Sequence, residues 1–211
     1  MTVEDNSRRK RLRLLISRLN KERRKQAKQI DILCNDFIAA QRAFISRLNA
    51  ISFAVSFYES ILGITDLGNL LQTVVKLVRE EIVDANVIFF LQQGEDFELH
   101  IFETGQASAV EKQHLENHFT PELMDNICKA NKVCTLEDML GMGLETNPAG
   151  LSRISAVTIP LGLAGSSMGF VLIYRCPAQS LYSDEVDKIA AVTCGFSQAI
   201  QACRELLRPA K

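Results

Sequence analysis

The sequence predicts an α+β fold. We expect a mainly antiparallel sheet of about five to six strands, flanked by helices on both faces and preceded by a long N-terminal coiled-coil helix. Three observations favour this fold. Residues 8–62 contain neither glycine nor proline and carry an apolar stripe of helical period. Short β-branched and aromatic runs then follow in pairs joined by turn residues. Amphipathic helical segments lie before, between and after these pairs.

Composition limits the class of protein. Of 211 residues, 47% are hydrophobic and 23% are charged, which is typical of a globular protein. No apolar run approaches the roughly 18 residues that span a membrane, so we expect a cytoplasmic protein. The net charge of −1 hides an asymmetry, because residues 1–28 hold 11 Lys and Arg against 3 Asp and Glu.

The long helix predicts a dimer. Its apolar positions recur mostly at alternating steps of three and four, with one extra step of four after Phe44. Arg23 and Gln26 fall on the stripe, which weakens it there. We expect a parallel coiled coil with a second copy; the alternative is a helix folded back on its own domain. The predicted dimer-interface residues are Leu12, Ile16, Leu19, Ile30, Leu33, Phe37, Phe44, Leu48, Ile51 and Val55.

The basic start of this helix, within residues 1–28, has two possible interpretations. Its Arg and Lys side chains are suited to contact with nucleic acid or with an anionic surface. It carries no aromatic residue for base stacking and no DNA-binding motif, so a solvated end of the coil is the alternative.

The middle of the chain predicts a helix, a hairpin and a second helix. Thr65 caps a helix over 66–82 with a regular apolar face. The apolar run 86–91 and the alternating run 97–103 predict paired strands around a turn. Residues 107–118 are ambiguous between helix and strand. Thr120 then caps a helix that starts at Pro121 and runs to about residue 132.

The last third predicts a hairpin and a terminal helix. A short strand over 133–136 leads into residues 137–150, whose glycines and Asn-Pro predict a long loop. Strands over 154–161 and 168–175 follow, joined by a turn at AGSS. Ser183 caps a final helix over 184–207. Helices 66–82 and 184–207 then cover one face of the sheet, and helix 121–132 with the long loop covers the other.

The glycines at 162, 165 and 169 raise the question of a phosphate-binding loop. Such a loop lies between a strand and a helix, and it needs a following Lys. Here the glycines precede the strand-like run FVLIYR, and no Lys or Arg lies between Arg153 and Arg175. The stretch therefore predicts a hairpin.

Several ordered patterns together resemble a GAF domain over roughly residues 57–208. They are ITDLGNLLQTVVKLVREEI, ANVIFFL, VCTLEDM, the IPL…G unit ending at Gly169, and YSDEVDKIAAVTCGFSQAI. The resemblance implies a small-molecule sensing module that regulates something else and dimerises next to a coiled coil. We therefore divide the chain into a basic coiled-coil segment (1–56), a GAF-like domain (57–208) and a tail (209–211).

The resemblance also implies where a ligand binds. The implied ligand-binding residues are His100, Phe102, Thr135, Asp138 and Arg153. Four of them have a plainer alternative: His100 as a rim histidine bonded to backbone, and Thr135, Asp138 and Arg153 as ordinary loop groups or caps. The Asn-Lys-Phe-Asp-Glu set of cyclic-nucleotide-binding members is missing, and no cysteine neighbours a histidine as in bilin-binding members.

We therefore expect a non-catalytic dimeric sensor of an unknown small molecule that signals through its N-terminal helix or a partner protein. We expect no cofactor and no metal, because His114 and His118 share a helical spacing without a third ligand. One alternative is an enzyme resembling free-methionine sulfoxide reductases, with Cys128 or Cys134 as a low-pKa thiol. Another is a purely structural dimerisation module.

Overall fold

The computed structural model describes residues 3–94, 96–102, 115–145, 154–163, 165–175 and 180–206, with side chains from Arg11 onward. The chain divides into two compact units, Met1–Asn49 and Ala50–Lys211. Helix α1 (Val3–Ile61) forms the first unit and the start of the second. The second unit begins before residue 57 because Phe53 is buried in its core together with Phe57 and Ile61.

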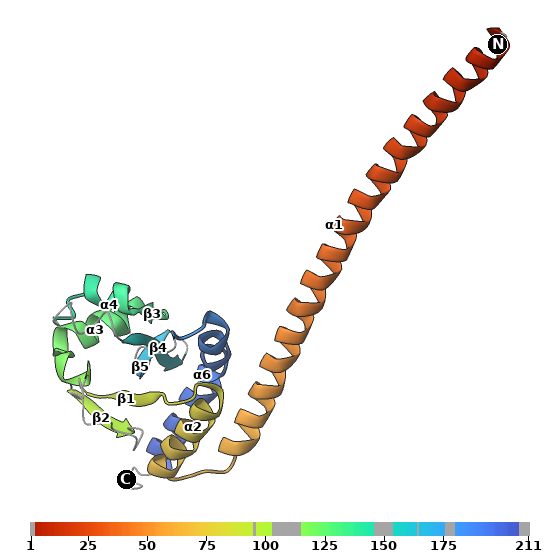
Figure 1. Ribbon diagram of the computed structural model, residues 1–211. Coiled ribbons are helices and arrows are strands. Elements are labelled where there is room, and N and C mark those ends of the chain that lie inside the picture. Colours follow the sequence, from red (N-terminus) through yellow and green to blue (C-terminus); the bar gives the residue numbers. More distant parts are fainter. Residues whose placement is uncertain are drawn as a thin grey trace. The chain divides into compact units, whose positions relative to one another are not determined.

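Within the described residues, five strands form one antiparallel sheet in the order β2-β1-β5-β4-β3 (Figure 1). The predicted hairpins are confirmed: β1 (Asn86–Gln93) pairs with β2 (Asp96–Phe102), and β4 (Ser155–Leu163) pairs with β5 (Ser166–Arg175). The short strand β3 (Cys134–Thr135) pairs with β4 at the opposite edge from β2. The α+β fold predicted from sequence is therefore present.

The glycines of the β4–β5 hairpin have a structural role. Gly165 has a φ of +84° in the turn. The pairing register shifts between Leu161 and Gly162, and a Cβ on Gly162 would lie 2.5 Å from the Ser166 carbonyl oxygen. Gly169 has a φ of +128°, and its Cβ would lie 1.9 Å from the Phe90 carbonyl oxygen of β1. The glycines thus permit a turn and a bulge, as a hairpin requires.

Helices α2 (Leu67–Glu81) and α6 (Ser183–Leu206) cover one face of the sheet, as predicted (Figure 1). Two predicted caps are corrected. Asp66 rather than Thr65 caps α2, because its carboxylate accepts from the Asn69 amide at 2.8 Å. Ser183 is the first residue of α6, and the amide before it, that of Tyr182, donates to the Glu185 carboxylate.

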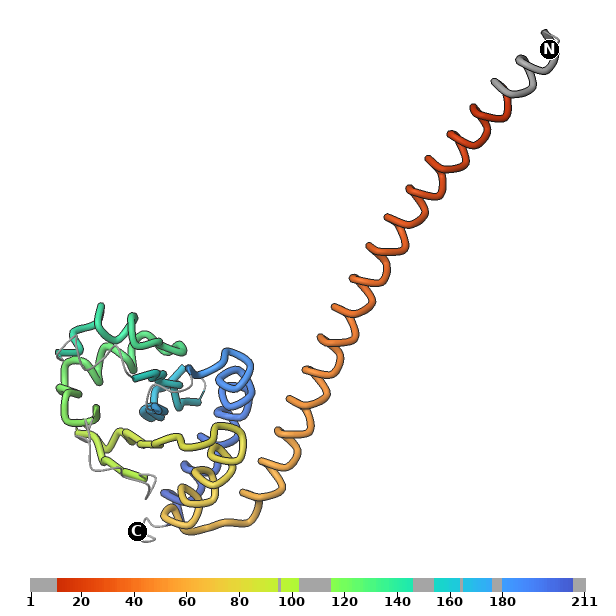
Figure 2. Tube along the Cα trace, viewed as in Figure 1, coloured from red at the N-terminus to blue at the C-terminus, as the bar shows by residue number. Residues whose placement is uncertain are grey.

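The other face is covered by a short 3₁₀ helix (Leu115–His118), α3 (Pro121–Ala130) and α4 (Leu136–Gly141) (Figures 1 and 2). Thr120 caps α3 and Pro121 opens it, as predicted. The predicted loop 137–150 is corrected over its first part, which is helical because Thr135 and Asp138 form a capping box. The ambiguous stretch 107–118 is described over 115–118 alone, where it is helical.

Candidate functional site

Two of the predicted ligand-binding residues lie on strand β2. His100 pairs with Phe89 and Phe102 pairs with Val87, and both partners belong to the core beneath α2 and α6. Antiparallel partners share a face of the sheet, so His100 and Phe102 face α2 and α6 rather than α3 and α4. The His100 Nε2 atom lies 3.0 Å from a Glu98 carboxylate oxygen on the same strand.

Two others act locally at the start of α4. The Asp138 carboxylate accepts from the Thr135 amide and hydroxyl, both at 2.9 Å, and the Thr135 hydroxyl accepts from the Asp138 amide at 3.3 Å. These bonds hold the pKa of Asp138 below its ordinary value, with a smaller contribution from Lys132. Thr135 and Asp138 therefore cap α4, which is the alternative role given above for these two residues.

The structure does not bring the predicted set together. Strands β2 and β3 are the two edges of the sheet, so His100 and Thr135 are separated by four strand spacings, roughly 19 Å. Arg153 lies outside the described residues. Phe102 and Thr135 line two different pockets among the described residues.

A groove of about 680 Å³ lies at the β3 edge and includes Thr135. Its walls come from the start of α4, the start of β4 and the first turns of α6. Most lining side chains are apolar, the hydroxyls come from Thr135, Ser155 and two serines near α6, and Glu137 and Asp187 are exposed acids. A groove of this size and mixed lining suits a small organic molecule. Sequence reasoning found Thr135 but missed its neighbours, because they come from three separate segments.

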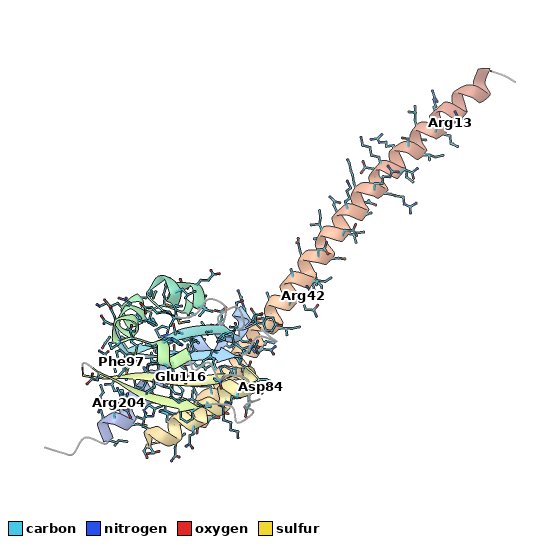
Figure 3. All side chains as sticks on the ribbon, turned by 60° about the vertical axis from the view of Figure 1, so that its left-hand side comes forward. Arg13, Arg42, Asp84, Phe97, Glu116 and Arg204 are labelled. Atoms are coloured by element: carbon cyan, nitrogen blue, oxygen red, sulfur yellow. The ribbon has the colours of Figure 1, made fainter. Side chains whose placement is uncertain are left out.

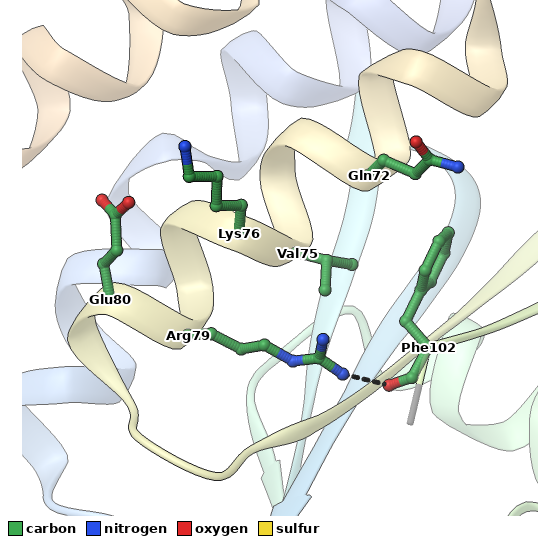
Figure 4. A pocket seen from close by; sticks show the side chains of 6 residues that line it. All are labelled: Gln72, Val75, Lys76, Arg79, Glu80 and Phe102. Carbon is green, nitrogen blue, oxygen red and sulfur yellow. Dashed lines mark hydrogen bonds between the residues drawn. The ribbon is translucent and has the colours of Figure 1, made fainter. Parts of the chain in front are cut away.

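A second, more open cavity of about 450 Å³ lies between α2 and β2 (Figure 4). Phe102 lines it beside Val75, and Arg79 crosses it. The Arg79 guanidinium donates to the Phe102 carbonyl at 2.9 Å and to the Ala85 carbonyl at 3.2 Å. Arg79 therefore ties α2 to the ends of β1 and β2, which is a structural role.

The α3–α4 face of the sheet is filled with aromatic side chains. The Phe90 ring stacks on Phe170 with centroids 4.6 Å apart and on Phe119 at 5.0 Å. Beside them the Tyr174 hydroxyl donates to the buried Glu116 carboxylate at 3.1 Å. The three phenylalanines are at most 8% exposed, so they occupy the space between the sheet and α3.

Solved structures match this arrangement at low sequence identity. One is the GAF domain/HD domain protein from Geobacter sulfurreducens, with a TM-score of 0.52 and 16% identity over 69% of this chain and 98% of that one. Another is the GAF domain of an Acinetobacter phosphoenolpyruvate-protein phosphotransferase, with a TM-score of 0.54 and 14% identity over 74% and 96%. The chain has a GAF fold.

A third matching structure is a chromophore-binding domain. It belongs to the Stigmatella aurantiaca bacteriophytochrome, with a TM-score of 0.53 and 12% identity over 74% of this chain and 60% of that one. No family model matches the chain, and no curated protein matches it. The likeness therefore establishes the fold, and the function is argued from the residues of this chain.

The two candidate thiols, Cys128 and Cys134, are buried in the second unit. Cys128 in α3 is 8% exposed and Cys134 in β3 is fully buried. Burial raises the pKa of both thiols above the ordinary value, although hydrogen bonds with Ser167 and Thr158 partly oppose this. A nucleophilic thiol needs the opposite shift, so these surroundings disfavour thiolate chemistry. No group of three or more metal-ligating side chains occurs among the described residues.

Helix α1 presents an apolar stripe and a basic surface. All ten predicted dimer-interface residues are between 48% and 69% exposed. Figure 3 shows the side chains of α1 as sticks, with Arg13 and Arg42 labelled. Every residue from 11 to 49 is exposed within the unit Met1–Asn49. No helix in the described part of the chain is long and apolar enough to cross a membrane.

Proposed function

We propose that this protein is a non-catalytic regulatory GAF-domain protein that works as a parallel homodimer joined along α1. It binds a small molecule in the GAF domain and passes the signal along α1 or to a separate protein. The observation that carries the proposal is the apolar stripe of α1, from Leu12 to Val55, whose side chains are about half exposed or more. An apolar stripe of this length stabilises a helix only when another surface covers it.

A second copy of α1 fits this stripe better than other partners. The stripe has the steps of three and four that place side chains at the seam of a two-helix coil. It includes two phenylalanines, Phe37 and Phe44, which are costly to leave in water. A parallel pair brings each residue opposite itself, so one mutation changes both sides of the interface.

The end of the stripe, Ile51 and Val55, lies in the second unit and is exposed there. Phe53, Phe57 and Ile61 of α1 are buried in the GAF core, whereas Ile51 and Val55 are 61% and 51% exposed. The last turns of α1 therefore have one face on the core and another toward water. This division supports a route by which a change in the GAF core could alter the coil.

The groove at the β3 edge is the ligand site that we propose. It joins α4, β4 and the first turns of α6, and Val186 of α6 belongs both to the groove and to the core that holds Phe57. A ligand that moves this part of α6 therefore acts on the same core that holds α1. The aromatic packing on the α3–α4 face instead favours the second candidate, a purely structural dimerisation module.

Native mass spectrometry of the full chain tests both candidates. We expect a dimer of twice 23.6 kDa that carries the additional mass of a retained metabolite. Phe37→Glu places two charges opposite each other in the seam, so we expect mainly monomer. Ala39→Glu is the matched control, because Ala39 lies on the other side of the helix and is also exposed.

The possible results distinguish the two candidate functions. A wild-type monomer at micromolar concentration contradicts the dimer, as does equal loss of dimer in both variants. A dimer with no retained mass contradicts the ligand part of the proposal and supports the structural module. Retained mass that is unchanged in Phe37→Glu places the ligand in the GAF domain rather than in the coil.

A further inference from the structure

We propose that the basic segment of α1, residues 11–28, is a binding surface for the phosphate backbone of double-stranded nucleic acid. This segment holds eight Lys and Arg against one Glu, a net charge of +7. All of its side chains are exposed. The next stretch, residues 29–49, holds two Arg against two Asp, so the positive charge ends at Lys28.

The basic side chains gather on one side of the helix. With Leu12 set at 0° and about 100° per residue, the stripe residues of this segment lie between about 300° and 40°. Arg23 lies within that arc at about 20°, and Leu14 interrupts the basic side at about 200°. The basic residues between about 100° and 260° are Arg11, Arg13, Arg18, Lys21, Arg24, Lys25 and Lys28. The apolar and basic sides are therefore opposite, and a coil that covers the first leaves the second in water.

The chemistry of this surface favours phosphate. Five of the eight cations are arginines, whose planar guanidinium groups bind phosphate oxygens in pairs. The segment is about 26 Å long as a helix, which matches several successive phosphates of a duplex. Residues 29–211 carry a net charge of −9 and on balance repel a polyanion. The basic segment 11–28 instead attracts one.

Two other polyanions fit the segment less well. A single-stranded nucleic acid is held by stacking on aromatic rings, and residues 11–28 contain no Phe, Tyr or Trp. A membrane surface takes the apolar face of a basic helix, usually through aromatic anchors. Here Leu12, Ile16 and Leu19 continue the stripe that the proposed coil covers, so that face is unavailable to lipid.

The dimer strengthens this surface without creating it. Two copies double the number of phosphates contacted, and the slope of log Kd against log salt grows by about 0.9 for each contact. Arg23 on the stripe allows the two helices to separate locally, which suits contact with both sides of a groove. The proposal rests on the coil for the steepness of the salt dependence and for the exclusion of lipid, not for binding of phosphate itself.

Fluorescence anisotropy with a labelled duplex of about 20 base pairs and mixed sequence tests the proposal on the full chain. We expect binding at about 50 mM NaCl that weakens by about 10³-fold or more by 200 mM, because six or more phosphates are contacted. Arg24→Gln with Lys28→Gln should weaken binding about tenfold or more and flatten the salt slope. Arg42→Gln with Arg47→Gln is the control that removes equal charge outside the segment, and it should leave binding nearly unchanged.

The other outcomes either overturn this proposal or distinguish its failure from a failure of the proposed coil. No binding at low salt, equal losses in the two double variants, or preference for vesicles with about 30% phosphatidylserine over the duplex would each overturn it. Light scattering on the same samples reports the oligomer. A monomer that binds the duplex, with about half the expected slope of log Kd against log salt, supports the basic surface and contradicts the coil. A dimer that does not bind the duplex supports the coil and contradicts the basic surface.

Discussion

Replacing Gly169 by alanine is expected to lower the free energy of unfolding by about 3–5 kcal/mol, because strain and overpacking add. Gly169 lies in β5 with a φ of +128°, a backbone conformation that an L-residue with a side chain rarely adopts. The added Cβ would lie 1.9 Å from the Phe90 carbonyl oxygen, so β1 and β5 must separate at the centre of the sheet. Chemical denaturation followed by circular dichroism measures the loss.

Two other glycines serve as controls for this prediction. Gly165 has a φ of +84° but open space around its Cβ, so Gly165→Ala should cost about 1 kcal/mol from backbone strain alone. Gly141 ends α4 at an ordinary φ with nothing within 4 Å, so Gly141→Ala should leave stability unchanged or raise it slightly. Similar stability in all three variants would contradict the assigned register of β1 and β5.

Phe170→Ala should cost about 3–5 kcal/mol, because it removes the centre of the aromatic stack between the sheet and α3. The Phe170 side chain is fully buried, and its ring contacts Phe90 at 4.6 Å, Phe119 at 5.9 Å and Phe97 at 6.4 Å between centroids. In a chain of this length such a loss lowers the melting temperature by roughly 6–20 °C. Differential scanning calorimetry provides the measurement.

Phe97→Ala is the matched comparison for the stack. Phe97 is partly exposed at the rim and contacts Phe170 in a tilted arrangement, so its removal leaves less of a cavity. We expect a loss clearly smaller than that of Phe170→Ala. An equal or larger loss from Phe97→Ala would mean that the face between the sheet and α3 is not packed around Phe170.

The fold could be predicted from sequence where the structure depends on a local sequence pattern. The cores of two strands, residues 87–91 of β1 and 170–173 of β5, are apolar at every position because helices cover both faces of the sheet. The residues of α4 belong to a longer stretch, 137–150, whose glycines and Asn-Pro together predict a loop. The T-x-x-D pattern of Thr135 and Asp138 was the signal that could have found the helix.

The candidate site could be read much less well. Side chains alternate between the two faces along β2, so His100 and Phe102 lie on the same face. This alternation does not indicate which helices pack on that face. Strand order is set by packing over the whole sheet, so the sequence could not place β2 and β3 at opposite edges. The groove at the β3 edge combines Thr135 with Leu181 and Asp187, which no sequence motif joins.

Disulfide cross-linking along α1 tests the central claim that two copies pair in parallel through the stripe. Leu33 is on the stripe and Ala39 is on the opposite side. Each would be replaced by cysteine in a chain with the exposed Cys34 and Cys194, and also Cys176, changed to serine. In a parallel coil Leu33→Cys lies opposite its own copy, so mild oxidation should join nearly all chains into dimers, while Ala39→Cys stays unlinked. No cross-link at Leu33→Cys, or equal cross-linking at both positions, would contradict the parallel coil.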